Sequence, residues 1–238
     1  MEGDLFMKIM LLAAGRGERM RPLTDHTPKP LLEVGGKPLI VWHIERLARA
    51  GLTDLAINHA HLGEQIVRTL GDGSRFGVSI QYSAEKIALE TAGGIANARH
   101  LLGDTPFAVI NADIYCDYDF TGLSAQTVAL VAGDDMAHLI MVDNPEQHPN
   151  GDFGLRDGRI TDSSPKLTFS GMGIYKHALF NHIPAGAVAP LAPLLRAQIA
   201  LNKVSGEHHK GHWVDVGTPQ RLQQLDIVLR ATHNTAHV

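Results

Sequence analysis

The chain has 238 residues, of which 44% are hydrophobic and 19% are charged, as is ordinary for a globular protein with a sizeable core. The formal net charge of −4 excludes a globally basic surface, so we expect no nucleic-acid partner, and the single cysteine, Cys116, excludes an intrachain disulfide. No apolar run approaches membrane-spanning length and the N-terminus lacks a secretory pattern, so we expect a cytoplasmic protein with no membrane partner.

Apolar runs alternate with segments of helical period along the chain. Strands are predicted over 9–14, 54–58, 78–83, 106–111, 137–142 and 167–175. Helices are predicted over 38–50, 62–70, 91–102, 191–200 and 219–231. The alternation predicts an α/β, doubly wound, three-layer sandwich with a mostly parallel sheet. The turn-rich segment 143–164 is interpreted as a loop or small β-excursion within a single domain spanning 1–238.

The first predicted strand ends in a glycine loop that carries several cations. Gly15 and Gly17 are followed by the motif Pro28-Lys29-Pro30, whose prolines restrict the backbone around the lysine. A Gly-x-Gly pair alone indicates only a tight turn, and the loop is neither a Walker A motif nor a dinucleotide fingerprint. The cations of the loop are Arg16, Arg19, Arg21 and Lys29. Together they predict a cradle for a polyanion such as a nucleoside triphosphate.

Two aspartates stand where a metal ion could be held. Asp113 directly follows a buried strand, and Asp215 follows a short strand and precedes a helix capped at Thr218. Each alone could be a capping or turn residue, but together they offer the hard oxygen ligands that Mg²⁺ prefers. The 14 histidines include closely spaced sets, yet no cysteine or well-placed carboxylate completes a zinc site, so zinc is not expected.

These motifs, in this order, resemble the sugar-1-phosphate nucleotidyltransferase family over residues 7 to about 229. The matching pieces are 12–19, 28–31, 37–40, the aspartate at 113 and the segment 213–219. The resemblance implies a Rossmann-like, GT-A-like nucleotidyltransferase fold. Its nucleotide-binding half is expected over 7–113 and its sugar-binding half over 114–231, with no hexapeptide-repeat domain.

The resemblance also implies an enzyme that transfers UMP from UTP to a sugar 1-phosphate, with Mg²⁺ as cofactor and pyrophosphate as second product. Further matching pieces at 17–24, 57–63, 71–77, 139–153 and 203–208 favour N-acetylmuramic acid α-1-phosphate as acceptor, and hence a role in peptidoglycan recycling. A monomer or small homo-oligomer is expected. Three alternatives stay open. The first is the same reaction on another sugar phosphate and nucleotide, namely mannose 1-phosphate with GTP or glucose 1-phosphate with TTP. The second is an inactive sugar-nucleotide sensor or regulatory subunit, and the third is a choline-phosphate cytidylyltransferase.

The resemblance assigns roles to individual residues. Catalytic roles fall to Arg19, Lys29, Asp113 and Asp215, and the two aspartates are the expected metal ligands. Nucleotide contacts are expected from Ala13, Ala14, Gly15, Gly17, Glu18, Arg19, Lys29, Thr91, Gly94 and Ala112. Sugar contacts are expected from Asn58, Glu90, Asp143, Asn144, Gly154 and Gly171. The chain lacks the family's usual sugar-phosphate lysine motif, and Lys166 is the candidate to replace that lysine.

Overall fold

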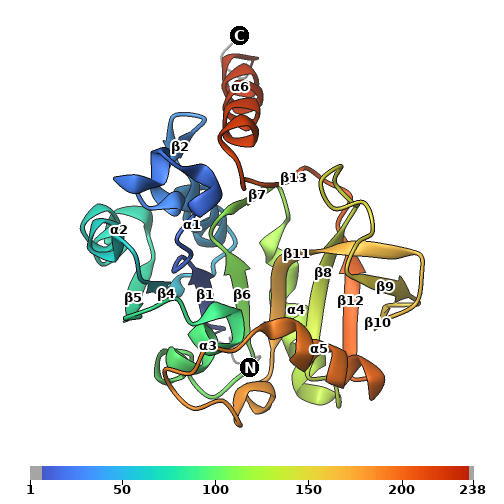
Figure 1. Cartoon of the computed structure of the whole chain (residues 1–238). Coiled ribbons are helices and arrows are strands. Elements are labelled where there is room, and N and C mark those ends of the chain that lie inside the picture. The colour runs from blue at the N-terminus through green and yellow to red at the C-terminus, as the bar shows by residue number, and fades with distance from the viewer. Residues whose placement is uncertain (1–6, 236–238) are drawn as a thin grey trace.

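The computed structural model describes residues 7–235 and is built on one nine-stranded sheet, with strand order β5-β4-β1-β6-β11-β8-β12-β10-β9 (Figure 1). Four strands of the N-terminal half run parallel to one another, namely β1 (Ile9–Leu12), β4 (Asp54–His59), β5 (Ser79–Ala84) and β6 (Phe107–Asn111). Strand β1 lies in the middle of this set, paired with β4 and β6. The carboxyl ends of these strands therefore meet at one edge, where α/β proteins bind ligands.

The C-terminal half extends the same sheet with mixed directions. Its strands are β8 (Ala137–Val142), β9 (Phe153–Arg156), β10 (Arg159–Thr161), β11 (Lys166–Tyr175) and β12 (Val204–His208). Strand β11 runs antiparallel to β6 and β8, whereas β12 runs parallel to β8. The β9–β10 hairpin is the β-excursion expected within 143–164, and β12 was not predicted.

Two small antiparallel ribbons stand outside the main sheet. One pairs β2 (Glu33–Val34) with β3 (Lys37–Pro38). The other pairs β7 (Ile114–Cys116) with β13 (Trp213–Asp215) and sets Asp215 opposite Ile114. This second ribbon brings the C-terminal part of the chain to the end of β6.

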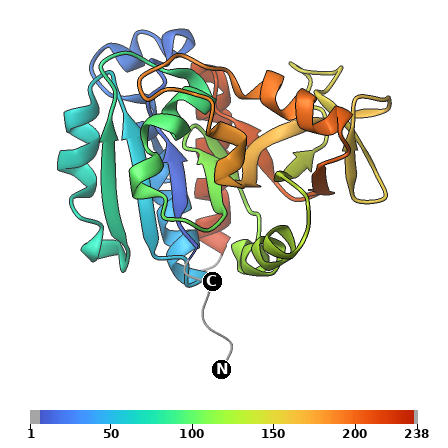
Figure 2. The same cartoon turned by 90° about the horizontal axis from the view of Figure 1, so that it is seen from below.

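Helices cover both faces of the sheet (Figure 2). Because side chains alternate along a strand, Ile9 and Leu11 of β1 enter one core and Met10 enters the other. The first core packs against α1 (Leu39–Arg49), α2 (Gly63–Leu70) and α4 (Leu123–Ala132). The second packs against α3 (Glu90–Asn97) and α5 (Leu191–Ala200). Short 3₁₀ turns occur at Glu18–Met20, Leu23–Asp25, Lys29–Leu31, Ser74–Phe76, Arg99–Leu101, Phe120–Gly122 and His177–Phe180.

The last helix, α6 (Pro219–Thr235), stands at the end of the molecule above β7 and β13 (Figure 1). Its Leu225 and Leu229 enter a third core with Val34, Trp42 and Tyr115. The helix was predicted to end at residue 231, but it continues to Thr235. No helix among the described residues combines the length and apolar character needed to cross a bilayer.

One helix prediction was wrong in detail, and one helix was missed. The segment predicted as one helix over 91–102 is α3 followed by a 3₁₀ turn, because the helix ends at Asn97. Helix α4 was not predicted. Its buried Leu123, Thr127 and Leu130 have helical spacing, but the exposed Val128 and Val131 next to them hide the amphipathic pattern.

Candidate active site

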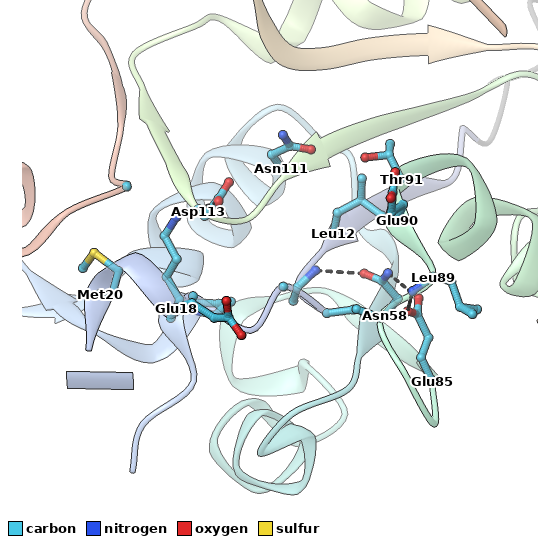
Figure 3. Close-up of a pocket in the computed structure, with 18 of the residues that line it drawn as sticks. Leu12, Glu18, Met20, Asn58, Glu85, Leu89, Glu90, Thr91, Asn111 and Asp113 are labelled. Carbon is cyan, nitrogen blue, oxygen red and sulfur yellow. Dashed lines mark hydrogen bonds and ion pairs between the residues drawn. The ribbon is translucent and has the colours of Figure 1, made fainter. Parts of the chain in front are cut away.

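A cavity of about 410 Å³, here called the first cavity, opens at the carboxyl ends of β1, β4 and β6 (Figure 3). The glycine loop forms one part of its wall and the start of α3 forms another. Figure 3 shows Asp113 and Asn111 on one side and Glu85 and Leu89 on the other. Its lining residues are Leu12–Gly15, Gly17–Met20, Lys29, Pro30, Asn58, Glu85, Ala88–Thr91, Asn111, Asp113 and Gly217.

Local hydrogen bonds fix the conformation of the glycine loop. Gly17 has a φ of 67°, and its carbonyl accepts hydrogen bonds from Met20 N (2.9 Å) and Thr24 Oγ1 (2.8 Å). A Cβ at Gly17 would lie 3.0 Å from Thr24 Cγ2, so glycine suits both the turn and the space. Within residues 7–235 the backbone N–H groups from Gly15 to Glu18 have no hydrogen-bond partner. Three of these residues, Gly15, Gly17 and Glu18, line the cavity, so their N–H groups are donors that an anion there could use.

Lys29 and Asp113 meet inside the site. The Lys29 side chain is buried, and its Nζ lies 2.7 Å from Asp113 Oδ2. Only two of the loop cations, Lys29 and Arg19, line the cavity. The other two lie against carboxylates: Arg21 pairs with Asp25 at 3.0 Å, and Arg16 approaches Glu18 at 3.7 Å.

A buried polar chain supports the floor of the first cavity. Asn58 Oδ1 accepts from Ala13 N (2.8 Å), while Asn58 Nδ2 donates to Glu85 Oε1 (2.6 Å). Glu85 Oε2 accepts from Leu89 N at 3.0 Å. Burial raises the pKa of Glu85 above its usual value, and its two hydrogen bonds oppose that rise. Asn58 therefore lies on the glycine-loop side, whereas we had expected it to contact the sugar.

A second cavity of about 350 Å³ adjoins the first and shares Arg19, Asn111 and Asp113 with it. Its remaining lining comes from the loop before β9, the middle of β11 and the β7–β13 ribbon. These residues are Ile114, Pro145, Gln147, His148, Thr168–Gly171, Trp213 and Asp215. Two ligands bound in the two cavities would face one another at Asp113.

The two candidate metal ligands are brought together by the β7–β13 ribbon. Val216 N donates to the Asp113 carbonyl (3.1 Å), and both aspartates line the second cavity. Arg221 Nη1 lies 2.8 Å from Asp215 Oδ2. Within residues 7–235 no group of three or more His, Cys, Asp or Glu side chains is placed to hold a metal. Two carboxylates facing a ligand cavity fit Mg²⁺, which usually takes one or two protein carboxylates and completes its shell with phosphate oxygens and water.

The other expected sugar contacts have mixed outcomes. Gly171 lines the second cavity, whereas Glu90, at a φ of 59°, lines the first. Three others line neither cavity. Asp143 contacts His208, Asn144 accepts from Thr168 and donates to backbone carbonyls, and a Cβ at Gly154 would meet the Ser163 carbonyl at 2.2 Å.

Three further residues expected at the site lie outside both cavities. Ala112 is fully buried, and Gly94 packs against Asn58 and Glu85, so neither lines a cavity. Lys166, the candidate for the sugar phosphate, donates instead to the Asp152 carbonyl and approaches Asp162 at 3.6 Å. The other expected nucleotide contacts, from Ala13 through Thr91, all line the first cavity.

Several lining residues were missed from the sequence. Asn111 was detectable, because a polar residue at the carboxyl end of a buried strand lies at the ligand edge. Glu85, His148, Thr168 and Ser170 carried no comparable signal. Their places depend on how the loops and β11 pack, which no local pattern encodes.

Comparison with known proteins agrees with this geometry. The family model "Nucleotidyl transferase" matches residues 8–229. The chain is 55% identical over 234 residues to the N-acetylmuramate alpha-1-phosphate uridylyltransferase of Neisseria meningitidis, covering 94% of this chain and 99% of that protein. It is 30% identical to a mannose-1-phosphate guanyltransferase of Hypocrea jecorina, covering 90% of this chain but 62% of that longer protein.

The fold is shared with solved structures of low sequence identity. A proposed glucose-1-phosphate thymidylyltransferase from Bacillus anthracis, solved with sucrose, superposes with a TM-score of 0.82 at 22% identity, covering 94% of this chain and 95% of that one. HddC from Yersinia pseudotuberculosis, solved with GMP-PN, superposes with a TM-score of 0.76 at 19% identity, covering 93% of this chain and 99% of that one. The expected nucleotidyltransferase fold is thereby confirmed.

Proposed function

The chain belongs to the nucleotidyl transferase family, and from that premise we propose that it transfers UMP from UTP to N-acetylmuramic acid α-1-phosphate, forming a UDP-sugar and pyrophosphate. The choice of base and sugar rests on the 55% identity to the Neisseria meningitidis uridylyltransferase, which extends over nearly the whole of both chains. The proposed setting is cytoplasmic recycling of peptidoglycan.

The observation that carries this proposal is the meeting of the two cavities at Asp113. The first cavity suits a triphosphate, because Gly15, Gly17 and Glu18 line it with backbone N–H groups that have no partner within residues 7–235. The second suits a sugar, because hydroxyl, amide and indole groups line it. A phosphate oxygen of the sugar would then approach the α-phosphorus at the junction.

The reaction is a displacement at phosphorus. A sugar-phosphate oxygen forms a bond to the α-phosphorus of UTP, and the bond from that phosphorus to the β-phosphate oxygen breaks, releasing pyrophosphate. The attacking oxygen is already anionic, so no general base is required. Catalysis then depends on positioning the two phosphates and on stabilising their charge.

The chain's own residues supply both effects. Lys29 would stabilise charge near the α-phosphate, since its ammonium lies at the junction beside Asp113. Arg19 lines both cavities and would hold the departing β- and γ-phosphates. Asp113 and Asp215 would hold Mg²⁺, which when bound lowers the repulsion between the two phosphate groups.

A product assay tests the proposal. UTP, CTP, GTP, TTP and ATP are each combined with the 1-phosphates of N-acetylmuramic acid, N-acetylglucosamine, glucose and mannose, and with phosphocholine. Pyrophosphate release and the mass of the product are measured, with and without EDTA. We expect UTP with N-acetylmuramic acid 1-phosphate to react fastest, and EDTA to abolish turnover.

Other outcomes identify the alternatives. Faster turnover of GTP with mannose 1-phosphate, of TTP with glucose 1-phosphate or of CTP with phosphocholine would overturn the assigned substrates. UTP binding without pyrophosphate release from any pair would point to the sensor alternative. Asp113→Asn serves as the inactive control.

A further inference from the structure

Few cationic groups reach the second cavity. Among its lining residues, all within the described part of the chain, only Arg19 and His148 can carry positive charge. Arg19 also lines the first cavity and stands at the junction, where the phosphates are expected. His148 lines the second cavity but not the first, so it is the basic side chain nearest the part of the acceptor that lies away from the phosphates.

The His148 ring is held in place by a carboxylate. Its Nε2 lies 3.1 Å from Asp152 Oδ1, and Asp152 Oδ2 accepts from Phe169 N at 2.8 Å. Asp152 thereby ties the imidazole to β11, the strand that contributes Phe169 to the cavity wall. The backbone of the loop adds support, because His148 N donates to the Pro145 carbonyl (2.8 Å) and Gly151 turns with a φ of 61°.

The hydrogen bonding of the ring leaves one nitrogen for a ligand. With Nε2 engaged by Asp152, Nδ1 has no hydrogen-bond partner within residues 7–235. A protonated imidazole donates through both nitrogens, so Nδ1–H is then a charged donor. The side chain is 43% exposed, which allows a ligand in the cavity to reach it.

N-acetylmuramic acid differs from N-acetylglucosamine by a lactyl ether on C3, which ends in a carboxylate. A carboxylate gains most from a charged N–H donor and is repelled by Asp113 and Asp215 at the junction. We propose that His148, positioned by Asp152, binds this carboxylate and sets the preference for an acidic sugar. The proposal rests on the function proposed above and names the residue that selects its acceptor.

The test compares two acceptors that differ only in that group. Purified wild-type protein and variants are assayed with UTP and either N-acetylmuramic acid 1-phosphate or its lactyl carboxamide, and kcat/KM is measured for each. Removing a hydrogen bond to a charged group typically costs roughly 10- to 100-fold. We expect kcat/KM of His148→Ala to fall by about that factor with the acid and to change less than about threefold with the amide. Asp152→Asn should lose part of the same preference, and His148→Lys should restore it.

Two control variants isolate the effect. His208→Ala breaks a similar histidine–aspartate pair, with Nε2 2.9 Å from Asp143 Oδ1, but His208 lines neither cavity, so the ratio of acid to amide should stay at the wild-type value. Arg19→Ala should lower turnover of both acceptors together. UTP binding and the circular dichroism spectrum verify that His148→Ala is folded.

Distinct results separate failure of this inference from failure of the proposed function. The inference is overturned if His148→Ala lowers kcat/KM equally for both acceptors or for neither. It is also overturned if Arg19→Ala is the variant that changes the ratio of kcat/KM between the acid and the amide. Wild-type protein that turns over neither acceptor would instead overturn the proposed function.

Discussion

At the scale of single residues, Lys29 has an environment unusual for a lysine. Its side chain is 7% exposed, and its ammonium is paired with Asp113. Buried lysines are rare unless paired. A Cβ at Gly17 would lie 3.2 Å from Lys29 Cβ, so the glycine loop packs directly on the lysine stem. The charge is therefore placed before any ligand binds, which is the condition for electrostatic stabilisation without reorganisation.

Replacing Lys29 by methionine tests that placement. Lys29→Met keeps the length of the side chain and removes the charge, so we expect kcat to fall by roughly 10²–10³-fold. The protein should stay folded, since Asp113 is 39% exposed and water can solvate it. Steady-state kinetics and a urea melt measure the two effects. Arg230→Gln, which removes an exposed cation of α6, should leave kcat unchanged. Wild-type turnover in Lys29→Met would contradict the role.

His43 is a buried residue outside the cavities that contacts the backbone directly after Asp113. Its Nε2 donates to the carbonyl of Ile114 (2.7 Å), directly after Asp113, while Nδ1 is buried without a hydrogen-bond partner. One turn later on α1, Arg46 Nη2 donates to the Tyr115 hydroxyl at 2.7 Å. Helix α1 therefore holds the start of β7 through two polar side chains. Burial lowers the pKa of His43 to about 4.

That lowered pKa predicts a loss of stability in mild acid. Between about pH 6.5 and pH 4 the unfolded chain binds a proton at His43 that the folded chain does not, so stability falls as the pH falls. From pH 7 to pH 5 protonation of His43 should lower the free energy of unfolding by about 2 kcal/mol. Urea unfolding at both pH values should show a smaller loss of unfolding free energy for His43→Gln, whose amide can still donate to Ile114. The exposed control His100→Gln should keep the wild-type decrease. An equal decrease in all three proteins would refute the assignment.

At the scale of elements, the irregularity in β11 shapes the second cavity. Its register with β8 shifts between Phe169 and Met172, and Gly171 there has a φ of 81°. Ser170 Oγ donates to the Ile140 carbonyl (2.6 Å), and the Ser170 carbonyl accepts from Trp213 Nε1 (3.0 Å). The bulge thus connects β11 to β13, the strand that carries Asp215. Bulges next to active sites commonly redirect side chains in this way.

Gly171→Ala should damage both stability and activity. An alanine at this position would have to adopt a left-handed backbone conformation, which costs about 1–3 kcal/mol. Its Cβ would also lie 2.6 Å from Asn111 Nδ2 in the cavity wall. We expect KM for the sugar phosphate to rise. Gly36→Ala is the matched control, because Gly36 has a φ of 86° with no atom within 4 Å of its Cβ. It should lose stability without losing activity. Similar kinetics in the two variants would count against the role of the bulge.

At the scale of the whole molecule, α6 packs the C-terminal part of the chain against β2 and α1 of the N-terminal half. Leu225 is 2% exposed in the third core, and Asp226 Oδ1 accepts from Gly35 N at 2.7 Å. The helix begins four residues after Asp215, and Arg221 in its first turns contacts that aspartate. Docking of α6 on β2 and α1 therefore helps to hold Asp215 near Asp113.

Leu225→Ala tests this docking. Truncating a fully buried leucine costs about 2–5 kcal/mol, which urea unfolding measures. If the helix also positions Asp215, the Mg²⁺ concentration that gives half-maximal turnover should rise in the folded variant. Ile227→Ala is the control on the same helix, since Ile227 is 62% exposed and should change neither quantity. A destabilised Leu225→Ala with wild-type metal dependence would show that α6 serves the fold alone.

The sequence by itself determined the family and most of the regular elements. The ordered motifs at 12–19, 28–31 and 213–219 predicted a nucleotidyltransferase, which the comparisons confirm. The strand over 137–142 and the helix over 191–200 were predicted with the bounds that the structure has. Such elements are local, because apolar period and flanking residues specify them without reference to distant partners.

Only the tertiary structure decided how the site is assembled. The β7–β13 pairing joins Asp113 to Asp215, and packing turns Lys29 and Arg19 towards the cavities but Arg16 and Arg21 towards carboxylates. Strand β12 was missed for the same reason. Its polar sequence lacks an apolar pattern, and its pairing with β8 places Gly206 where a Cβ would meet Ile160 Cδ1 at 2.5 Å. These arrangements depend on contacts between residues far apart in the chain, which periodicity and motif spacing do not contain.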